Sequence, residues 1–372
     1  MSKEKIINIF QQTPSSSSLI QRIQATKQLL VQDWEERMVR MSKNPKVIDR
    51  ILSLPEELQY RFFGEQITEE TQASLQNYAL RYLRIQYGRV KRDIINMNWI
   101  DLPTLFNQLF KAFTKDDYQY KNQSYYNVDE VVVLLYLKNQ FVEKISMPQM
   151  KFLLIDEVQD YNSAQILLLN KLFPRSQFTM VGDENQSIFN SHIRFDKIIE
   201  HFDSRPAAIQ LYNLLNSYRS SGSITKLFSQ LALNNDQWEI VPIRPEGDIP
   251  IARKTVKTSE LIEFITEIQK KINQQILTII TKTDQQANEL YSQIGKDQLQ
   301  ALNCEILPIT LSKGLEFDHV LIYQVSEDNY HNQRDKRILY TAASRAMKNL
   351  FVNYSNSISS LLAEGSYIES KV

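Results

Sequence analysis

Hydrophobic positions in the first 146 residues recur at the spacing of α-helices. After a polar start at 13–18, apolar side chains across 19–38 repeat every three or four residues, and 71–97 and 127–140 show the same period. Basic residues within 71–97 could touch phosphate, but a solvated helix face is the simpler interpretation. This part of the chain is therefore predicted to be all-helical.

From residue 147 onward, short apolar runs alternate with amphipathic stretches. The runs predict buried strands and the stretches between them predict helices. Such alternation is typical of an α/β fold, in which parallel sheets are covered by helices on both faces. The predicted strands cover 152–155, 178–181, 207–212, 277–280, 306–310, 320–325 and 350–354, and the predicted helices cover 163–172, 223–233, 259–272, 284–294 and 336–347.

Two successive strands of this series end in polar residues. The run 152–155 leads directly into Asp156 and Glu157, an acidic pair of the kind that holds Mg²⁺ and orients a water in nucleoside triphosphatases. An acid pair that only caps the next helix is the simpler alternative. The run 178–181, however, is soon followed by Gln186, whose amide can bond a phosphate oxygen. Because ligands bind beyond the carboxyl ends of parallel strands, two such tips in succession favour a nucleotide site.

Composition narrows the class of protein. The chain has 43 Lys and Arg against 43 Asp and Glu, so its net charge does not indicate a polyanion partner. Any nucleic-acid contact must therefore be made by a local patch of the surface. The single cysteine, Cys304, excludes an internal disulfide framework, and the four histidines do not cluster with it at metal-site spacing. No N-terminal run combines a basic stretch with a long apolar one. These features suit a cytoplasmic protein that does not enter a membrane.

Five motifs follow one another between residues 155 and 347. They read D-E-V-Q-D, V-G-D-E-N-Q-S-I-F, N-S-Y-R-S-S, L-S-K-G-L-E-F-D and Y-T-A-A-S-R-A. In order and wording they closely resemble motifs II to VI of UvrD-type superfamily 1 helicases. The finer wording looks most like the HelD branch, motors that act on RNA polymerase. The resemblance is strong from about residue 147 onward and covers the helical first part only in general character.

The resemblance implies two RecA-like lobes with a cleft between them that binds ATP and Mg²⁺, and DNA or RNA polymerase as partners. It implies a helical arm at 1–146, the remainder of the first lobe at 147–205 and a complete second lobe at 206–372. Simpler alternatives are that Arg219 and Arg345 are ordinary surface helix arginines and that Tyr218 is a core residue. The implied roles are metal binding by Asp156, water activation by Glu157, γ-phosphate sensing by Gln186, adenine stacking by Tyr218, γ-phosphate binding by Arg219, close backbone approach at Gly314, ribose bonding by Glu316 and an arginine finger at Arg345.

A phosphate-binding P-loop is missing from these 372 residues. Such a loop needs two glycines five positions apart, the second followed by Lys and then Ser or Thr, and no two of the eight glycines have that spacing. Because the family places this loop upstream of motif II, the first lobe is expected to lack its central strand and to expose a sheet edge or an apolar face. Either the helical region covers that face, or an upstream-encoded polypeptide supplies the missing part.

Three classes of function follow. The first is the C-terminal part of an ATP-dependent DNA helicase or translocase that is inactive alone. The second is a non-catalytic module, derived from such a helicase, that binds RNA polymerase or nucleic acid, and the third is a gene fragment without a selected function. Retention of Asp156, Glu157, Arg219 and Arg345 favours the first class, because a decayed site would have lost some of these side chains.

Overall fold

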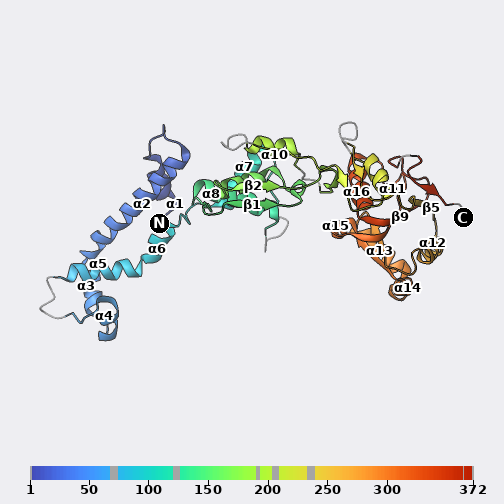
Figure 1. The fold of residues 1–372 in the computed structure, drawn as a ribbon. Coiled ribbons are helices and arrows are strands. Elements are labelled where there is room, and N and C mark those ends of the chain that lie inside the picture. Colours follow the sequence, from blue (N-terminus) through green and yellow to red (C-terminus); the bar gives the residue numbers. More distant parts are fainter. Residues whose placement is uncertain are drawn as a thin grey trace. The chain divides into compact units, whose positions relative to one another are not determined.

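The computed structural model describes residues 2–67, 74–119, 126–189, 193–202, 209–232, 239–362 and 364–370. The chain divides into two compact units (Figure 1). One unit comprises Met1–Pro148 with Lys171–Pro174, and the other comprises Gln149–Asn170 with Arg175–Val372.

The first unit is helical, as the periodicity predicted. Ser18 begins its longest helix with a capping box, in which Gln21 N donates to the Ser18 hydroxyl and the Gln21 side chain accepts from Ser18 N. The single pattern predicted at 71–97 is two helices that meet at Tyr87, and 71–73 lie outside the described residues. The helices are α1 (Lys3–Gln11), α2 (Leu19–Ser42), α3 (Pro45–Leu52), α4 (Glu56–Phe63), α5 (Leu75–Gln86), α6 (Gly88–Ile95), α7 (Leu102–Thr114) and α8 (Val128–Phe141).

Two of the basic residues on α5 and α6 have a structural role. Arg84 Nη2 lies 2.8 Å from Glu35 Oε2, and Lys91 Nζ lies 2.6 Å from Glu35 Oε1, so both helices are tied to α2. Burial alone would raise the pKa of Glu35, but the hydrogen bonds from Lys91 and Arg84 outweigh it and lower the pKa. These two side chains are accounted for by packing between helices rather than by contact with phosphate.

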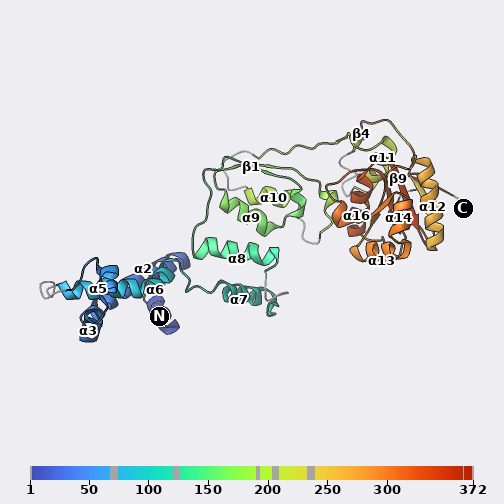
Figure 2. The ribbon, with the colours of Figure 1, turned by 90° about the horizontal axis from the view of Figure 1, so that it is seen from below.

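The second unit begins with a small parallel sheet of β1 (Phe152–Ile155) and β2 (Gln177–Met180), in which Phe152 pairs with Gln177 and Ile155 with Met180. Helices α9 (Ser163–Leu172) and α10 (Phe195–Phe202) lie beside these strands (Figure 2). Buried side chains from the strands and helices, including Ile155, Ile166 and Phe202, form one apolar cluster. On the other face of β1, Phe152 and Leu154 are exposed.

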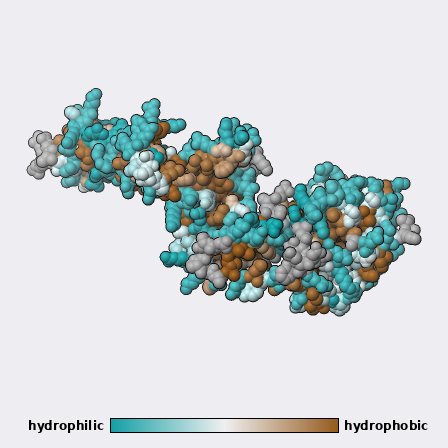
Figure 3. Space-filling view, turned by 90° about the horizontal axis from the view of Figure 1, so that it is seen from above, coloured by the Kyte–Doolittle hydropathy of each residue, from teal (hydrophilic) through white to brown (hydrophobic). Residues whose placement is uncertain are grey.

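Burial was wrongly predicted for the first strand. Phe152 is 64% exposed and Leu154 is 77% exposed, whereas Ile155, the last residue of β1, is buried. The four apolar residues in a row suggested two covered faces, but helices cover only one. Apolar side chains reach the surface in several places on the face of the molecule drawn in Figure 3.

A larger sheet forms the rest of the second unit. Its strand order is β10-β5-β9-β8-β6-β7, and every neighbouring pair is parallel. The strands are β5 (Ile251–Lys254), β6 (Leu277–Thr281), β7 (Cys304–Pro308), β8 (Phe317–Ile322), β9 (Ala346–Tyr354) and β10 (Ile368–Glu369). The helices are α11 (Gly222–Gln230), α12 (Thr258–Lys271), α13 (Asp284–Ile294), α14 (Lys296–Ala301), α15 (Ile309–Ser312) and α16 (Gln333–Ser344).

Alternating side chains of these strands enter two separate cores. Val320 and Ile322 of β8 pack with α11 and α16, whereas Leu321 between them packs with α12, α13 and α14. The sheet is therefore covered on both faces, which confirms the predicted α/β class (Figure 2). Among the described residues, no helix is long and apolar enough to cross a membrane.

Most predicted elements of this region are present, but four predicted bounds need correction. The strand predicted at 320–325 ends at Ile322, and the helix predicted at 336–347 ends at Ser344, because β9 begins at Ala346. The run 306–310 is a strand only as far as Pro308, because Ile309 begins the short helix α15. The strand predicted at 207–212 is not formed in 209–212, and 207 and 208 lie outside the described residues. Shortly after it, β3 (Asn216–Ser217) pairs in parallel with β4 (Val241–Pro242).

Candidate nucleotide-binding site

The acidic pair after β1 is oriented by a buried glutamine. Glu157 has a left-handed backbone (φ 51°) and is the N-cap residue of the short 3₁₀ helix Val158–Asp160. Gln159 is fully buried and donates from Nε2 to Glu157 Oε2 at 2.5 Å. Its Oε1 accepts from Asp183 N, beyond the end of β2, at 3.1 Å. Gln159 therefore fixes the Glu157 carboxylate relative to both strand tips.

Gly182 leaves the space that the Gln159 amide occupies. A Cβ atom at residue 182 would lie 2.3 Å from Gln159 Oε1. We expect Gly182→Ala to displace this amide and to destabilise the protein by about 1–3 kcal/mol, the usual cost of overpacking. Gly88→Ala is the matched control, because a Cβ there meets nothing within 4 Å and alanine favours the helix. Differential scanning calorimetry of both variants checks this, and equal melting temperatures would contradict it.

The segment after β2 is linked to α16 through Asp183 and Gln186. Asp183 Oδ2 accepts from Gln186 Nε2 at 3.0 Å and from the Tyr340 hydroxyl at 2.9 Å. Gln186 Oε1 accepts from Arg345 Nη2 at 2.5 Å. Burial, together with the Asp183 carboxylate, raises the pKa of Tyr340 well above its ordinary value, so the hydroxyl stays a donor. The Gln186 amide is thus held at both ends.

Arg345 is a buried residue, so the alternative of a surface helix arginine is wrong for it. It is 2% exposed at the end of α16 and donates to the carbonyl oxygens of Thr341 and Leu315, each at 3.3 Å. Burial lowers its pKa, as does the nearby Arg219, whereas Glu157 and other carboxylates raise it. The guanidinium lies within electrostatic range of the acid expected to activate water.

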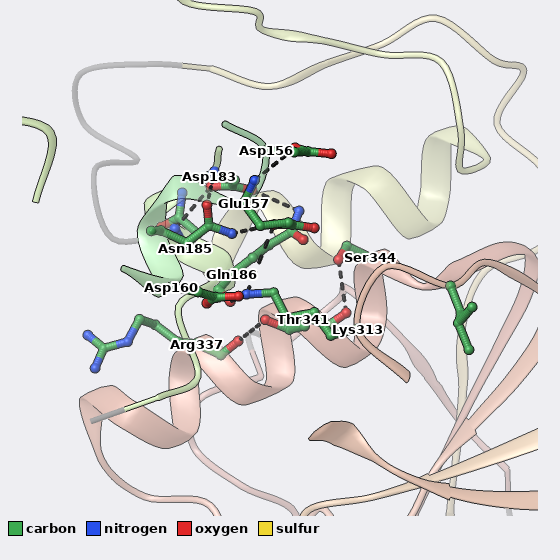
Figure 4. Close-up of polar contacts among 12 residues, drawn as sticks. Asp156, Glu157, Asp160, Asp183, Asn185, Gln186, Lys313, Arg337, Thr341 and Ser344 are labelled. Carbon is green, nitrogen blue, oxygen red and sulfur yellow. Dashed lines mark hydrogen bonds and ion pairs between the residues drawn. The ribbon is translucent and has the colours of Figure 1, made fainter. Parts of the chain in front are cut away.

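Lys313 was not assigned a role from the sequence, although it precedes Gly314 in the fourth motif. Its Nζ lies 2.5 Å from Asp160 Oδ1, 3.1 Å from the Gln186 carbonyl oxygen and 4.0 Å from Glu157 Oε2. Figure 4 shows its side chain extending to this group, with Asp160 and Gln186 close to its end. Lys313 therefore places a positive charge among the acids that follow β1.

A cavity of about 550 Å³ opens beside these contacts. Tyr218 lines it and is 65% exposed, so the alternative of a core tyrosine is wrong. Arg219 and Glu316 also line it and form an ion pair, with Arg219 Nη2 2.6 Å from Glu316 Oε1. Its further lining residues include Asp183, Gln186, Leu214, Leu215, Phe228, Ile240, Arg244, Tyr340 and Met347.

The remaining predicted residues lie outside the cavity lining. Gly314 has a positive φ of 77°, and a Cβ there would meet nothing within 4 Å, so its backbone is open to approach. Asp156 lies at the edge of the polar group, apart from Lys313 (Figure 4), and its Oδ1 accepts from Glu157 N at 2.8 Å. The structure brings Gln186, Tyr218, Arg219 and Glu316 together at the cavity.

The acidic pair fits a magnesium site of the type that is completed by phosphate. Mg²⁺ keeps several waters and binds through one or two carboxylates together with substrate phosphates. Asp156 is exposed and presents a free carboxylate oxygen next to Glu157. No group of three or more His, Cys, Asp or Glu side chains arranged to hold a metal occurs in the described ranges. Asp156 and Glu157 would hold the ion only as part of such a shared site.

Comparisons with known proteins agree with the motif wording. The UvrD/REP helicase N-terminal domain model matches residues 3–198, and the viral superfamily 1 RNA helicase core domain model matches residues 126–353. The first match includes the helical unit. The motifs alone gave that unit only a general resemblance to the family. Sequence reasoning missed this because no short motif marks the helices.

Relatives with curated names match part of the chain. The ATP-dependent DNA helicase Rep of Escherichia coli K12 is 35% identical over 103 residues, 27% of this chain and 15% of Rep. Rep of Buchnera aphidicola subsp. Baizongia pistaciae is 27% identical over 192 residues, 47% of this chain and 28% of that protein. The C-terminal domain of a possible DNA helicase from Lactobacillus plantarum WCFS1 aligns at 24% identity and a TM-score of 0.34, covering 42% of this chain and 99% of that one.

Proposed function

The chain belongs to the UvrD/Rep-type family of superfamily 1 helicases, and on this basis we propose that it is part of an ATP-dependent DNA helicase or translocase. The observation that supports the proposal most is the linked set Glu157–Gln159–Asp183–Gln186–Arg345, which connects both strand tips to α16. The chain spans 15% of the E. coli Rep and 28% of the Buchnera protein. ATP, Mg²⁺ and DNA are therefore part of the proposal.

In this proposal the residues beyond β1 and β2 act on the terminal phosphate. Asp156 would hold Mg²⁺, and the ion would supply neutralisation of the phosphate charge. Glu157, oriented by Gln159, takes the proton of the attacking water. Gln186 and Arg345 already share a hydrogen bond, so a γ-phosphate that meets one meets the other. Both would stabilise the charge that develops during phosphoryl transfer.

The cavity residues hold the rest of the nucleotide. Tyr218 offers its exposed ring to the adenine, and Gly314 leaves the backbone open to the ligand. Arg219 and Glu316 are paired with each other, so binding separates them: a phosphate replaces the carboxylate at Arg219, and Glu316 turns to the ribose hydroxyls. An ion pair between half-exposed side chains is worth little, so this exchange costs little.

The uncovered face of β1 supports completion of the first lobe by another polypeptide. A two-stranded sheet is marginal in water, and Phe152 and Leu154 leave apolar area without cover. Leu214, beside the cavity, is 88% exposed. A partner that contributes the P-loop strand and its helix, encoded upstream, would cover such surface and provide the phosphate ligands that these 372 residues lack.

The finer assignments belong to the same proposal. A helical arm at 1–146, a first-lobe remainder at 147–205 and a second lobe at 206–372 are the proposed domains, in a cytoplasmic protein. The HelD-like wording of the motifs favours RNA polymerase as a second partner besides DNA. The alternative function is a non-catalytic module that binds polymerase or nucleic acid. Nucleotide binding distinguishes the two, because only the motor requires it.

We expect the purified chain to hydrolyse ATP at no more than background, because the β- and γ-phosphates lack the P-loop lysine and amides. Adding a polypeptide that contains a P-loop strand and helix of this family should restore Mg²⁺-dependent hydrolysis. A coupled phosphate-release assay measures both conditions. The P-loop polypeptide with its lysine replaced by alanine is the control. Robust turnover by the chain alone that Glu157→Gln abolishes would prove a complete site and defeat the proposal.

A further inference from the structure

The cavity contains an arginine to which no motif assigns a role. Arg244 lines the cavity together with Tyr218 and Arg219. Within the part of the chain that the structure describes, its side chain forms no ion pair or hydrogen bond. The other cavity arginine is neutralised, because Arg219 is paired with Glu316. Arg244 is therefore the uncompensated positive charge of the cavity lining.

The backbone on both sides of Arg244 is fixed. Before it, Val241 N donates to Leu215 O at 2.9 Å and Ile243 N donates to Ser217 O at 3.0 Å, so this segment runs beside the one that leads to Tyr218. After it, the carbonyl oxygens of Pro245 and Glu246 accept from the first residues of α11 at 2.8 and 2.7 Å. Arg244 is thus placed at the cavity by the fold and not by a free loop.

Gly247 shows how closely the segment after Arg244 packs against the start of α11. Gly247 has a φ of 71°, and a Cβ there would lie 2.6 Å from Ser221 Cβ. The chain after Arg244 therefore passes against the start of α11 at a distance that a side chain would prevent. Because little backbone freedom remains to be lost on binding, a contact made by Arg244 gains affinity from preorganisation.

Arg244 and Tyr218, which both line the cavity, suit a ligand that has a negatively charged group and a planar ring. A guanidinium fork suits phosphate oxygens, and an exposed tyrosine ring suits the face of a base. The volume of about 550 Å³ lies in the range of small-molecule sites. We propose that Arg244 is a nucleotide-binding residue that donates to a phosphate oxygen of the ligand in this cavity. This inference rests on the proposed nucleotide function and adds a residue that the motifs do not contain.

The experiment measures the binding of three probes to the full chain. ADP, adenosine and inorganic pyrophosphate are titrated as competitors of a fluorescent N-methylanthraniloyl-ADP. Arg244→Gln is expected to raise the Kd of ADP and of pyrophosphate by about tenfold, the usual effect of losing a charge-assisted hydrogen bond, and to change the Kd of adenosine less than twofold. Arg244→Lys, which keeps the charge but loses the fork, should fall between.

Arg175→Gln is the matched control. Arg175 is also exposed but precedes β2, at the opposite end of that strand from Asp183, so its loss should leave all three Kd values unchanged. Because Arg244 is exposed, its variants should melt at the wild-type temperature. Circular dichroism verifies this before binding is compared.

The possible outcomes separate this inference from the function on which it rests. If the wild-type chain binds no nucleotide even together with the P-loop polypeptide, the proposed function and the role of Arg244 are both refuted. If the wild type binds ADP and Arg244→Gln binds it equally well, the role of Arg244 is refuted and the proposed function stands. Equal weakening of ADP and adenosine would also refute a phosphate contact, because adenosine has no phosphate.

Discussion

Replacing Arg345 by lysine is expected to lower the kcat for ATP by about 10³-fold or more in the assembly completed with the P-loop polypeptide, and to change nucleotide affinity little. An arginine finger stabilises charge that develops only in the transition state, an effect worth about 10³ to 10⁵ in rate. Lysine keeps a charge but lacks the planar fork, through which Arg345 bonds the Leu315 carbonyl from Nη1 and Gln186 from Nη2. Alanine is a poorer choice, because Arg345 is buried and its loss would leave Gln186 unpaired.

Tyr218→Ala provides the opposite kinetic signature. Its ring is largely exposed, so truncation should not unfold the protein. Stacking on adenine is present equally in the ground and transition states, so KM should rise while kcat stays unchanged. Steady-state kinetics of both variants, with thermal unfolding as a check on folding, measures the contrast. If both variants changed kcat and KM alike, the roles of Arg345 and Tyr218 would have to be withdrawn.

The second large effect concerns stability. Lys282 Nζ lies 2.6 Å from Asp335 Oδ1, and the Asp335 carboxylate is buried and also accepts from His331 N at 3.1 Å. The Lys282 ammonium lies over the Tyr330 ring, 5.0 Å from its centre. Lys282→Met would leave a buried carboxylate without its counter-ion. We expect it to lower the free energy of unfolding by about 3–5 kcal/mol.

The double variant Lys282→Met with Asp335→Leu tests the cause. Removing both charges removes the uncompensated one, so the double variant should be more stable than Lys282→Met alone. Urea denaturation of the wild type, both single variants and the double variant gives the coupling energy. Additive losses would show that the two side chains contribute independently and would contradict the ion-pair explanation.

Local chemistry explains which elements the sequence could predict. The helices predicted at 163–172 and 284–294 coincide with α9 and α13, because capping residues precede both. Asn162 accepts from Gln165 N at 2.9 Å, and Thr283 accepts from Gln286 N at 3.2 Å. The strand before the acidic pair could be predicted for a similar reason, because four apolar residues end abruptly in carboxylates.

The features that could not be predicted depend on residues far apart in the chain. Leu154 is as apolar as a buried strand residue, and its exposure depends on which layers pack against β1. Lys313 lies 153 positions from its partner Asp160, so its burial has no local signal. Arg244 is part of no motif, and only the pairing of its segment beside β3 brings it to the cavity. The motifs point to particular residues but do not reveal how the side chains of those residues pair.

The junction at Arg345 has a mechanical consequence. Strand β9 begins at the next residue, without a loop, and lies between β5 and β8 in the sheet. The Arg345 carbonyl accepts from Phe317 N at 2.9 Å, which ties the junction to β8 as well. A displacement of the Arg345 backbone would therefore pass directly into β9 and its neighbour β8, because no loop separates the residue from the sheet.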